Sequence, residues 1–199
     1  LLGGVRGALG GRLTGLYLSG SLASGDFDPA SSDIDFIAVT VAELEGHELA
    51  ALDAVHRGLR GGDTRWAEHI EGIYLPLPTL RRFVPPGGPR PVLEIGGTFK
   101  VSQEGWDGVL HRHILREQGV VLTGPPPRPL IDPVSPDDLR RAVAGLLQGW
   151  WAEQLRDPSL FQTREYQAFA VLSMCRALHT LDQGTLLSKP AAAAWATAH

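Results

Sequence analysis

The sequence predicts an α+β protein with two parts, a mixed α/β domain over residues 1–124 and an α-helical bundle over residues 137–199. In the first part, short apolar runs alternate with segments of helical period, as in a layer of strands covered by helices. A proline-rich stretch at 125–136 reads as a linker, and every apolar pattern after it has helical period. With 199 residues and 43% hydrophobic residues, the chain can bury two small cores.

The chain begins with a helical pattern at 5–15 and a short buried strand at 16–19, which ends at Gly20 and Ser21. A strand followed by a glycine turn is an arrangement that binds phosphate. Gly20 has no side chain to keep a phosphate from the backbone, and Ser21 adds a hydroxyl donor. We therefore expect both residues to contact a phosphate group.

Two carboxylates follow a polar loop, in the run Ser32-Asp33-Ile34-Asp35 that opens an apolar segment at 36–39. Residues two apart on a strand point to the same side, so Asp33 and Asp35 are expected to project together. The repulsion between them is offset if a hard cation binds, and Mg²⁺ prefers one or two carboxylates together with phosphate oxygens. An Asp-x-Asp pair alone also occurs in ordinary turns, so the prediction depends on the ordered combination of glycine turn, loop and acidic strand.

Two other nucleotide motifs are excluded in this region. No Gly-Lys-Ser/Thr follows the glycines, which excludes a P-loop, and the Gly-x-Gly-x-x-Gly pattern of dinucleotide-binding folds is absent.

Residues 41–60 carry apolar residues at helical spacing and are expected to form an amphipathic helix. Its two histidines, His47 and His56, are expected at the surface or at an interface rather than as metal ligands.

A strand is expected at 67–77, with Glu71, Ile73 and Leu75 on one face. An acid among apolar neighbours has two readings, a solvent-facing acid on an edge strand or a functional carboxylate. The sequence pattern leaves both open.

The rest of the first part is less regular. Prolines predict an irregular loop at 81–97, and residues 100–107 are undecided. A helix at 109–117 leads to residues 119–123, which form either a short buried strand or an exit from helix to strand.

In the second part, Ser135 is expected to cap a helix that starts with Pro136. Helical patterns cover 139–155, 166–182 and 190–199. The last pattern lacks a closing partner, so we expect part of the bundle to be missing or supplied by another chain.

Composition narrows the function classes. A net charge of −4 and a pI near 6.0 argue against nucleic acid as a partner and suit a cationic small molecule. A single cysteine, Cys175, excludes an internal disulfide and is compatible with the cytoplasm, and no apolar run suggests a membrane partner. Residues 1–6 lack an initiator methionine and a signal-peptide pattern, which predicts an N-terminally trimmed chain.

The pattern G-S-x(3)-G-x(7)-D-x-D, formed by Gly20, Ser21, Gly25, Asp33 and Asp35, resembles the signature of polymerase-beta-type nucleotidyltransferases. The resemblance implies that Asp33 and Asp35 bind Mg²⁺, that ATP is a co-substrate, and that Gly20, Ser21 and Ser32 contact the nucleotide. It also implies a third carboxylate on a neighbouring strand, which favours Glu71 as a catalytic residue.

The second half resembles the bacterial aminoglycoside 3″-adenylyltransferases with their helical C-terminal domain. The similar runs are Val121-Leu-Thr-Gly-Pro125, Ile131-Asp-Pro-Val134, Leu172-x-x-Cys175-Arg176 and Gly184-x(3)-Ser188-Lys189-x(5)-Trp195-Ala196. The resemblance implies that Arg176 and Lys189 hold the triphosphate, while only Trp150 falls on a position expected to bind the antibiotic.

We therefore expect a Mg²⁺-dependent adenylyltransferase that moves AMP from ATP to a hydroxyl of a small cationic acceptor such as an aminoglycoside, with a role in antibiotic resistance. The alternatives are a module that adenylylates a protein side chain and an antitoxin-like regulatory module of the same fold.

Overall fold

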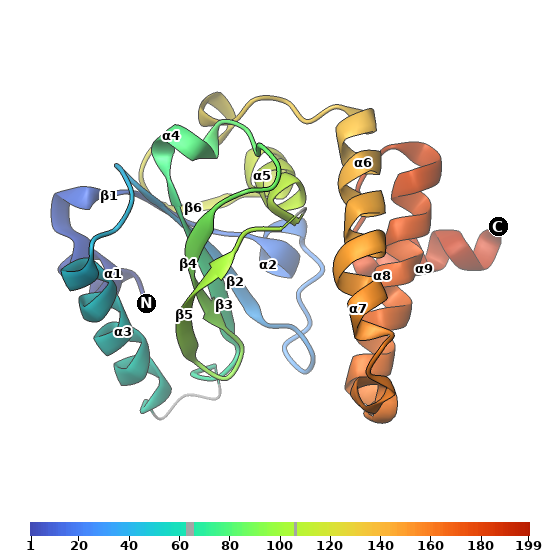
Figure 1. Cartoon of the computed structure of the whole chain (residues 1–199), viewed down its shortest axis with the longest axis horizontal. Coiled ribbons are helices and arrows are strands. Elements are labelled where there is room, and N and C mark those ends of the chain that lie inside the picture. Colours follow the sequence, from blue (N-terminus) through green and yellow to red (C-terminus); the bar gives the residue numbers. More distant parts are fainter. Residues whose placement is uncertain (63–65, 106) are drawn as a thin grey trace. The chain divides into compact units, whose positions relative to one another are not determined.

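The computed structural model describes residues 1–62, 66–105 and 107–199 and confirms the predicted α+β class, with a mixed sheet and C-terminal helices (Figure 1). The chain divides into two compact units, which are described separately below. The first comprises Leu1–Glu104 and His111–Pro133, and the second comprises Gly105–Leu110 and Val134–His199. None of the described helices is both long and apolar enough to cross a lipid bilayer.

The first unit is built on a six-stranded sheet of order β5-β4-β3-β2-β1-β6. Its strands are β1 Leu13–Leu18, β2 Ile34–Thr40, β3 Ile70–Pro76, β4 Pro89–Glu94, β5 Thr98–Gln103 and β6 Val120–Thr123. Its helices are α1 Leu2–Leu9, α2 Gly20–Ser24, α3 Gly46–Arg60, α4 Leu77–Leu80 and α5 Asp107–Gln118, although the start of α5 is grouped with the second unit.

Strands β2 and β3 are parallel, and the other neighbouring strands pair antiparallel. A parallel pair needs a long crossover, which α3 provides between β2 and β3. The pairing therefore brings the starts of β2 and β3 to the same end of the sheet.

The two faces of the sheet carry separate cores. On one face, α1 and α3 lie side by side and pack against the sheet (Figure 1); this core contains Val5, Leu52, Phe36 and Tyr74. The core on the opposite face includes Leu115 of α5 and contains Ile37, Val39, Ile73, Leu75 and Ile131 among others. The predicted alternation of β3 is confirmed, because Ile73 and Leu75 belong to one core and Tyr74 to the other.

The first helix is shorter than the predicted 5–15. Helix α1 ends at Leu9, and Gly10 follows with a φ of +50°, a backbone conformation that favours glycine. The strand then begins at Leu13, three residues before its predicted start.

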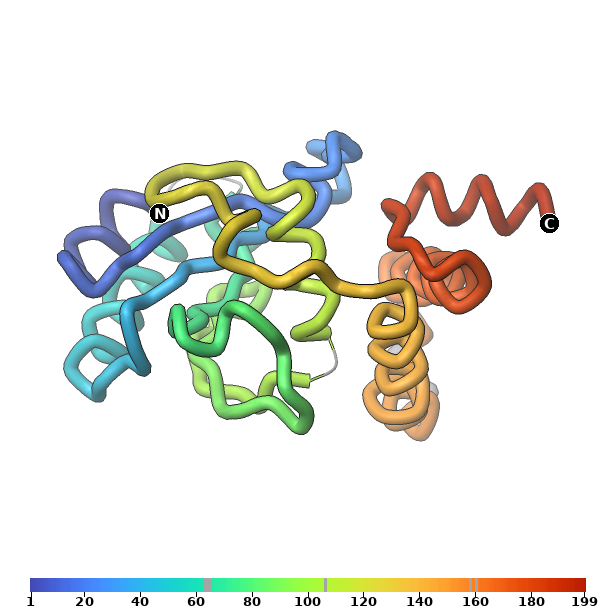
Figure 2. The backbone as a smooth tube through the Cα atoms, turned by 90° about the horizontal axis from the view of Figure 1, so that it is seen from above, coloured from blue at the N-terminus to red at the C-terminus, as the bar shows by residue number. Residues whose placement is uncertain are grey.

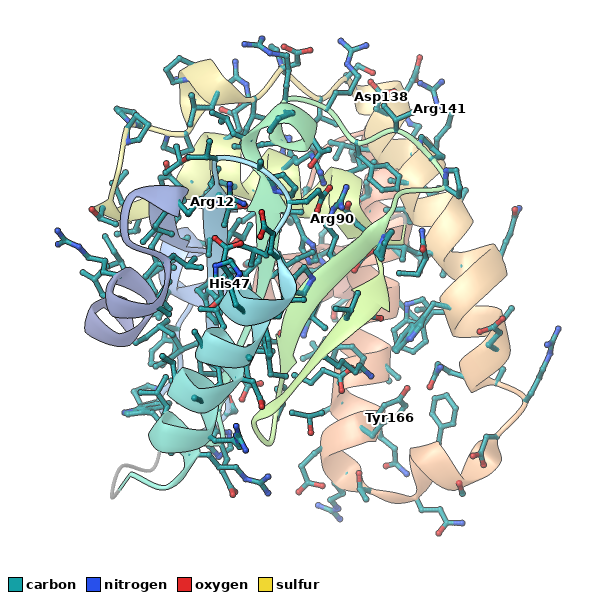
Figure 3. All side chains as sticks on the ribbon, turned by 60° about the vertical axis from the view of Figure 1, so that its left-hand side comes forward. Arg12, His47, Arg90, Asp138, Arg141 and Tyr166 are labelled. Atoms are coloured by element: carbon teal, nitrogen blue, oxygen red, sulfur yellow. The ribbon has the colours of Figure 1, made fainter. Side chains whose placement is uncertain are left out.

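Helix α3 begins at Gly46 because Glu45 and Glu48 form a capping box. The Glu45 backbone N–H and then Arg12, whose Nε lies 2.8 Å from Glu48 Oε1, keep the pKa of the buried Glu48 carboxyl below its ordinary value. Figure 3 labels Arg12 and His47 near this end of α3.

Of the two positions predicted for the histidines, the surface holds for His47 only, and His56 lies at the interface between α3 and the sheet. His47 is exposed, but His56 is 2% exposed and its Nε2 lies 2.8 Å from the Tyr74 hydroxyl. Between Tyr74, Phe36 and Phe99, the imidazole is part of an aromatic cluster, so it stays uncharged. Burial lowers the pKa of His56 from its ordinary 6.5 to about 4.

This buried histidine predicts a loss of stability in acid. As the pH falls from 6.5 towards 4, His56 becomes protonated in the unfolded chain but stays neutral in the folded protein. The free energy of unfolding should therefore fall by about 3 kcal/mol over this range. Urea unfolding at several pH values, compared with His56→Gln, isolates this contribution from the carboxylates. Parallel pH profiles of the two proteins would contradict the assignment.

Residues 81–97 were predicted as a loop, and this was wrong, because β4 forms within them. Pro89 and Pro91 lie two apart, so both missing N–H groups face the same side of the strand. Strand β4 pairs with β3 only at Val92 and Leu93, whereas it pairs with β5 along its whole length. At Pro89 and Pro91, β4 therefore has a partner strand on one side only, so the missing N–H groups of the prolines cost no hydrogen bond to β3.

Strand β6 is less buried than predicted, since Val120, Val121 and Leu122 are 38–43% exposed at the edge of the sheet. The segment after it packs on the first unit. Tyr17 donates a hydrogen bond to the Pro125 carbonyl (2.8 Å), and Asp132 forms ion pairs with Arg81 and Arg82.

The second unit is helical, as predicted. Its helices are α6 Pro136–Leu146, a π-helical turn Leu147–Trp151, α7 Ala152–Gln154, α8 Arg164–Gln183 and α9 Lys189–Ala198. The predicted cap is confirmed: the Ser135 hydroxyl accepts a hydrogen bond from Asp138 N, and Pro136 begins α6. Helix α8 packs against both α6 and α9. Figure 2 draws the backbone of these helices as coils, with α6 in orange and α9 in red.

Candidate active site

Asp35 and Glu71 lie directly opposite each other on the parallel strands β2 and β3. Paired strands are about 4.8 Å apart, and residues in register on parallel strands share a face, so the two carboxylates project from the same side. Their face is that of Ile37 and Ile73, two residues further along each strand. Both acids are partly buried, so they stand where the apolar core on this face ends.

Gly20 lies against the carboxylate of Asp35. A Cβ at position 20 would fall 1.8 Å from Asp35 Oδ2, and the φ of Gly20 is +58°. The Ser19 N–H donates to the Asp35 carbonyl (2.9 Å), which ties the end of β1 to β2 and places Gly20 there. A glycine is required at this position for two independent reasons, the close approach and the backbone conformation.

Asp33 lies just before β2, which begins one residue later than the strand opening that we predicted. Its Oδ1 lies 3.0 Å from Nδ1 of His69, while the Ile34 N–H donates to the His69 carbonyl. His69 was not singled out from the sequence. His69 stands two residues before Glu71, just as Asp33 stands two residues before Asp35. This matching spacing is the sequence feature that could have indicated a contact between His69 and Asp33.

The other residues of the motif shape the loop between α2 and β2. Gly25 ends α2 with a φ of +80°, and the Ser21 carbonyl accepts a hydrogen bond from Asp26 N. The Ser32 hydroxyl accepts one from Asp28 N (3.0 Å). Asp28 in turn accepts from the Ala30 backbone and the Ser31 hydroxyl, which lower the pKa of its carboxyl. Ser32 therefore closes the loop that leads into the acidic strand.

The acids fit a magnesium ion that is bound jointly with a substrate. Across the described ranges, no group of three or more His, Cys, Asp or Glu side chains is arranged as a complete metal site. Mg²⁺ needs no such site, because it keeps several waters and takes only one or two carboxylates beside phosphate oxygens. Asp33 and Asp35 offer hard oxygen ligands, and Gly20, which has no Cβ, lets the main chain lie against the Asp35 carboxylate.

In the second unit, Trp150 lies in the π-helical turn and is 43% exposed. Its ring meets Trp151 edge-on, with centroids 4.7 Å apart, and Trp151 stacks on Phe169 of α8. The Tyr166 hydroxyl, labelled in Figure 3, donates to Gln154 Oε1 (3.2 Å). Trp150 is thus the exposed end of an aromatic cluster, and π-helical turns occur frequently at functional sites.

Arg176 and Lys189 occupy α8 and the first turn of α9. Lys189 Nζ lies 4.4 Å from the centre of the Phe169 ring, a cation–π geometry. Both side chains are partly buried. The same aromatic cluster therefore contacts Trp150 and Lys189.

Two of three comparisons with known proteins found a match. Residues 129–199 match the family model of the aminoglycoside adenylyltransferase C-terminal domain. Among solved structures, the spectinomycin adenyltransferase AAD(9) from Enterococcus faecialis, determined with ATP and spectinomycin, matches with a TM-score of 0.75 and 17% sequence identity, over 96% of this chain and 77% of that chain. No curated protein matches the sequence.

The resemblance expected from the sequence is thus confirmed: this chain resembles the aminoglycoside adenylyltransferases, by family over residues 129–199 and by fold over nearly its whole length.

Proposed function

We propose that this protein is a Mg²⁺-dependent adenylyltransferase that transfers AMP from ATP to a hydroxyl group of an aminoglycoside-type acceptor. The observation that carries the proposal is the apposition of Asp35 and Glu71 beside Gly20 at one end of the sheet. The family match of residues 129–199 supports the acceptor class. The net charge of −4 suits a polycationic acceptor.

In the proposed reaction, the acceptor oxygen attacks the α-phosphorus of ATP, the bond to the β-phosphate oxygen breaks, and pyrophosphate leaves. Glu71 takes the proton of the attacking hydroxyl. Asp33 and Asp35 would hold Mg²⁺, which supplies positive charge to the phosphate oxygens. Gly20 and Ser21 offer the backbone and hydroxyl donors for the phosphates, and Ser32 holds the loop beside them.

Mass spectrometry tests the proposal directly. The protein is incubated with Mg²⁺ and ATP, in turn with spectinomycin, other aminoglycosides and a mixture of proteins, and each acceptor is examined for the added mass of AMP. Adenylylated aminoglycoside with equimolar pyrophosphate is the expected result. Modification of proteins alone would refute the proposed acceptor. No modification of any acceptor would refute the proposed reaction.

Glu71→Gln should separate chemistry from binding. The amide is nearly isosteric but cannot accept the proton, so we expect a fall in kcat of about 100-fold or more with ATP affinity unchanged. Calorimetry with ATP and Mg²⁺ beside a rate assay measures both. Equal losses would make Glu71 a metal ligand, and no loss would leave it an ordinary acid of β3.

Arg176 and Lys189 are proposed to contact the triphosphate, because both match the family's positions. Replacing both by Ala should weaken ATP binding by about 100-fold or more, since each charged hydrogen bond contributes roughly 1.5–3 kcal/mol. Calorimetry with Arg141→Ala, an exposed arginine of α6, as the control measures this loss. Unchanged ATP affinity in the double variant would mean that the second, helical unit does not bind the triphosphate and contacts the acceptor only.

A further inference from the structure

A second candidate site lies in the first unit, in a cavity of about 190 Å³ beside helix α4. Its lining includes three arginines and one acid, namely Arg82, Arg90, Arg112 and Glu104, together with Phe83 and Val84. Arg90 is labelled in Figure 3, at the start of β4.

The cavity is distinct from the carboxylate site. Val92 pairs with Ile73 and Leu93 with Gly72 in antiparallel register, so β4 runs back from Val92 to Arg90 away from the end of the sheet where Glu71 lies. None of the residues that line the cavity belongs to the candidate active site.

Among the buried side chains of this cavity, guanidinium groups outnumber carboxylates. The side chains of Arg90, Arg112 and Glu104 are 8%, 2% and 2% exposed, so two guanidinium groups share one buried carboxylate. Arg112 donates to Glu104 and, at 2.9 Å, to the Thr79 carbonyl. Arg90 reaches a second acid, Glu43 (3.0 Å), but that carboxylate is 63% exposed and screened by water. The buried groups alone therefore carry a net positive charge, which an anion in the cavity would balance.

One buried donor next to the cavity also lacks an acceptor. Nε of Arg90 is 3.4 Å from Glu104 Oε2, yet it makes no hydrogen bond of acceptable geometry with the described residues. Buried guanidinium N–H groups are almost always satisfied, and oxyanions are the acceptors that fit them best. The donor and the excess charge therefore point to the same class of ligand.

From this geometry we propose that the cavity binds a small oxyanion through Arg90, with Arg82 and Arg112 adding positive charge. A cavity of about 150 Å³ holds benzene, so the present one takes a single phosphate or carboxylate group but not a nucleotide. Phe83, which is 8% exposed and lies 5.7 Å below the Arg112 guanidinium, makes one wall apolar. Arg82, 73% exposed and paired with Asp132, lies where an anion would enter.

Titration of the arginine side-chain signals tests the site without an activity assay. In protein labelled with ¹⁵N-arginine, inorganic phosphate at constant ionic strength should shift the Nε–H resonance of Arg90 saturably and raise the Tm, whereas chloride should do neither. Acetate serves as the carboxylate arm: a response to phosphate alone identifies a phosphate ligand, and a response to acetate alone a carboxylate. No response above that to chloride overturns the proposal.

Variants locate the binding. Arg90→Met should abolish the phosphate-dependent rise in Tm. Since this change disturbs a buried ion pair, Val84→Glu is the second variant, because Val84 is 69% exposed and its replacement spares the fold. The added negative charge at the cavity should weaken phosphate binding at least about tenfold, and Val84→Gln should leave it unchanged. Equal phosphate affinity in Val84→Glu and Val84→Gln would place the anion elsewhere and overturn the proposal.

Discussion

Replacing Asp35 by Asn is expected to lower kcat/KM by about 1,000-fold or more, and Asp33→Asn should act in the same direction. The amide removes a charge that would hold Mg²⁺ against the triphosphate, and a loss of about 4 kcal/mol of transition-state stabilisation corresponds to this factor. Rates measured over a range of Mg²⁺ concentrations, with pyrophosphate release as the readout, give the effect. If Asp35→Asn kept the wild-type rate at the Mg²⁺ concentration used for the wild type, Asp35 would not be a ligand of the metal.

The same substitution should not destabilise the protein without ligand. Asp35 and Glu71 are like charges placed directly opposite each other on neighbouring strands, and such pairs cost up to about 1 kcal/mol. Thermal melts should therefore show an apo Tm that equals or exceeds that of the wild type, with a smaller rise on adding Mg²⁺ and ATP. A lower apo Tm would mean that Asp35 is needed for folding rather than for catalysis.

Gly20→Ala should reduce activity almost as strongly while leaving the fold intact. The new methyl group would meet Asp35 Oδ2 at 1.8 Å, so the carboxylate must move away from the position in which we propose that it binds the metal. A displacement of about 1 Å of a catalytic group can cost about 100-fold in rate. The positive φ adds roughly 1–2 kcal/mol of backbone strain. Steady-state kinetics and urea unfolding measure the two effects separately.

Gly96→Ala is the matched control for this variant. Gly96 has a φ of +83°, but a Cβ there would meet nothing within 4 Å. It should therefore lose a similar amount of stability and keep its activity. If Gly20→Ala and Gly96→Ala lost activity equally, the loss would come from strain, and the contact between Gly20 and Asp35 would have no catalytic role.

The sequence alone determined the local features of this protein. Alternation along β3 assigned Ile73 and Leu75 to one core and Tyr74 to the other, and the helix start at Ser135 and Pro136 was found from its capping residues. These features depend on residues two to four positions apart, whose relative orientation the backbone of a strand or helix sets by itself. The resemblance to the nucleotidyltransferases is also local, because the glycine turn and the acidic strand that carry it lie within 16 residues of each other, from Gly20 to Asp35.

The tertiary structure decided whatever depends on partners far away in the chain. Pattern alone left His56 at the surface or at an interface, and only the packed chain buries it, through a hydrogen bond to Tyr74 and aromatic neighbours from other elements. The prolines of β4 indicated a loop, and only the pairing with β5 made a strand there. The contact of Gly20 with Asp35, the pairing of Asp33 with His69 and the shared buried acid of Arg90 and Arg112 all join separate strands and helices. Strand register and burial set these contacts, and both are properties of the packed chain rather than of any one segment.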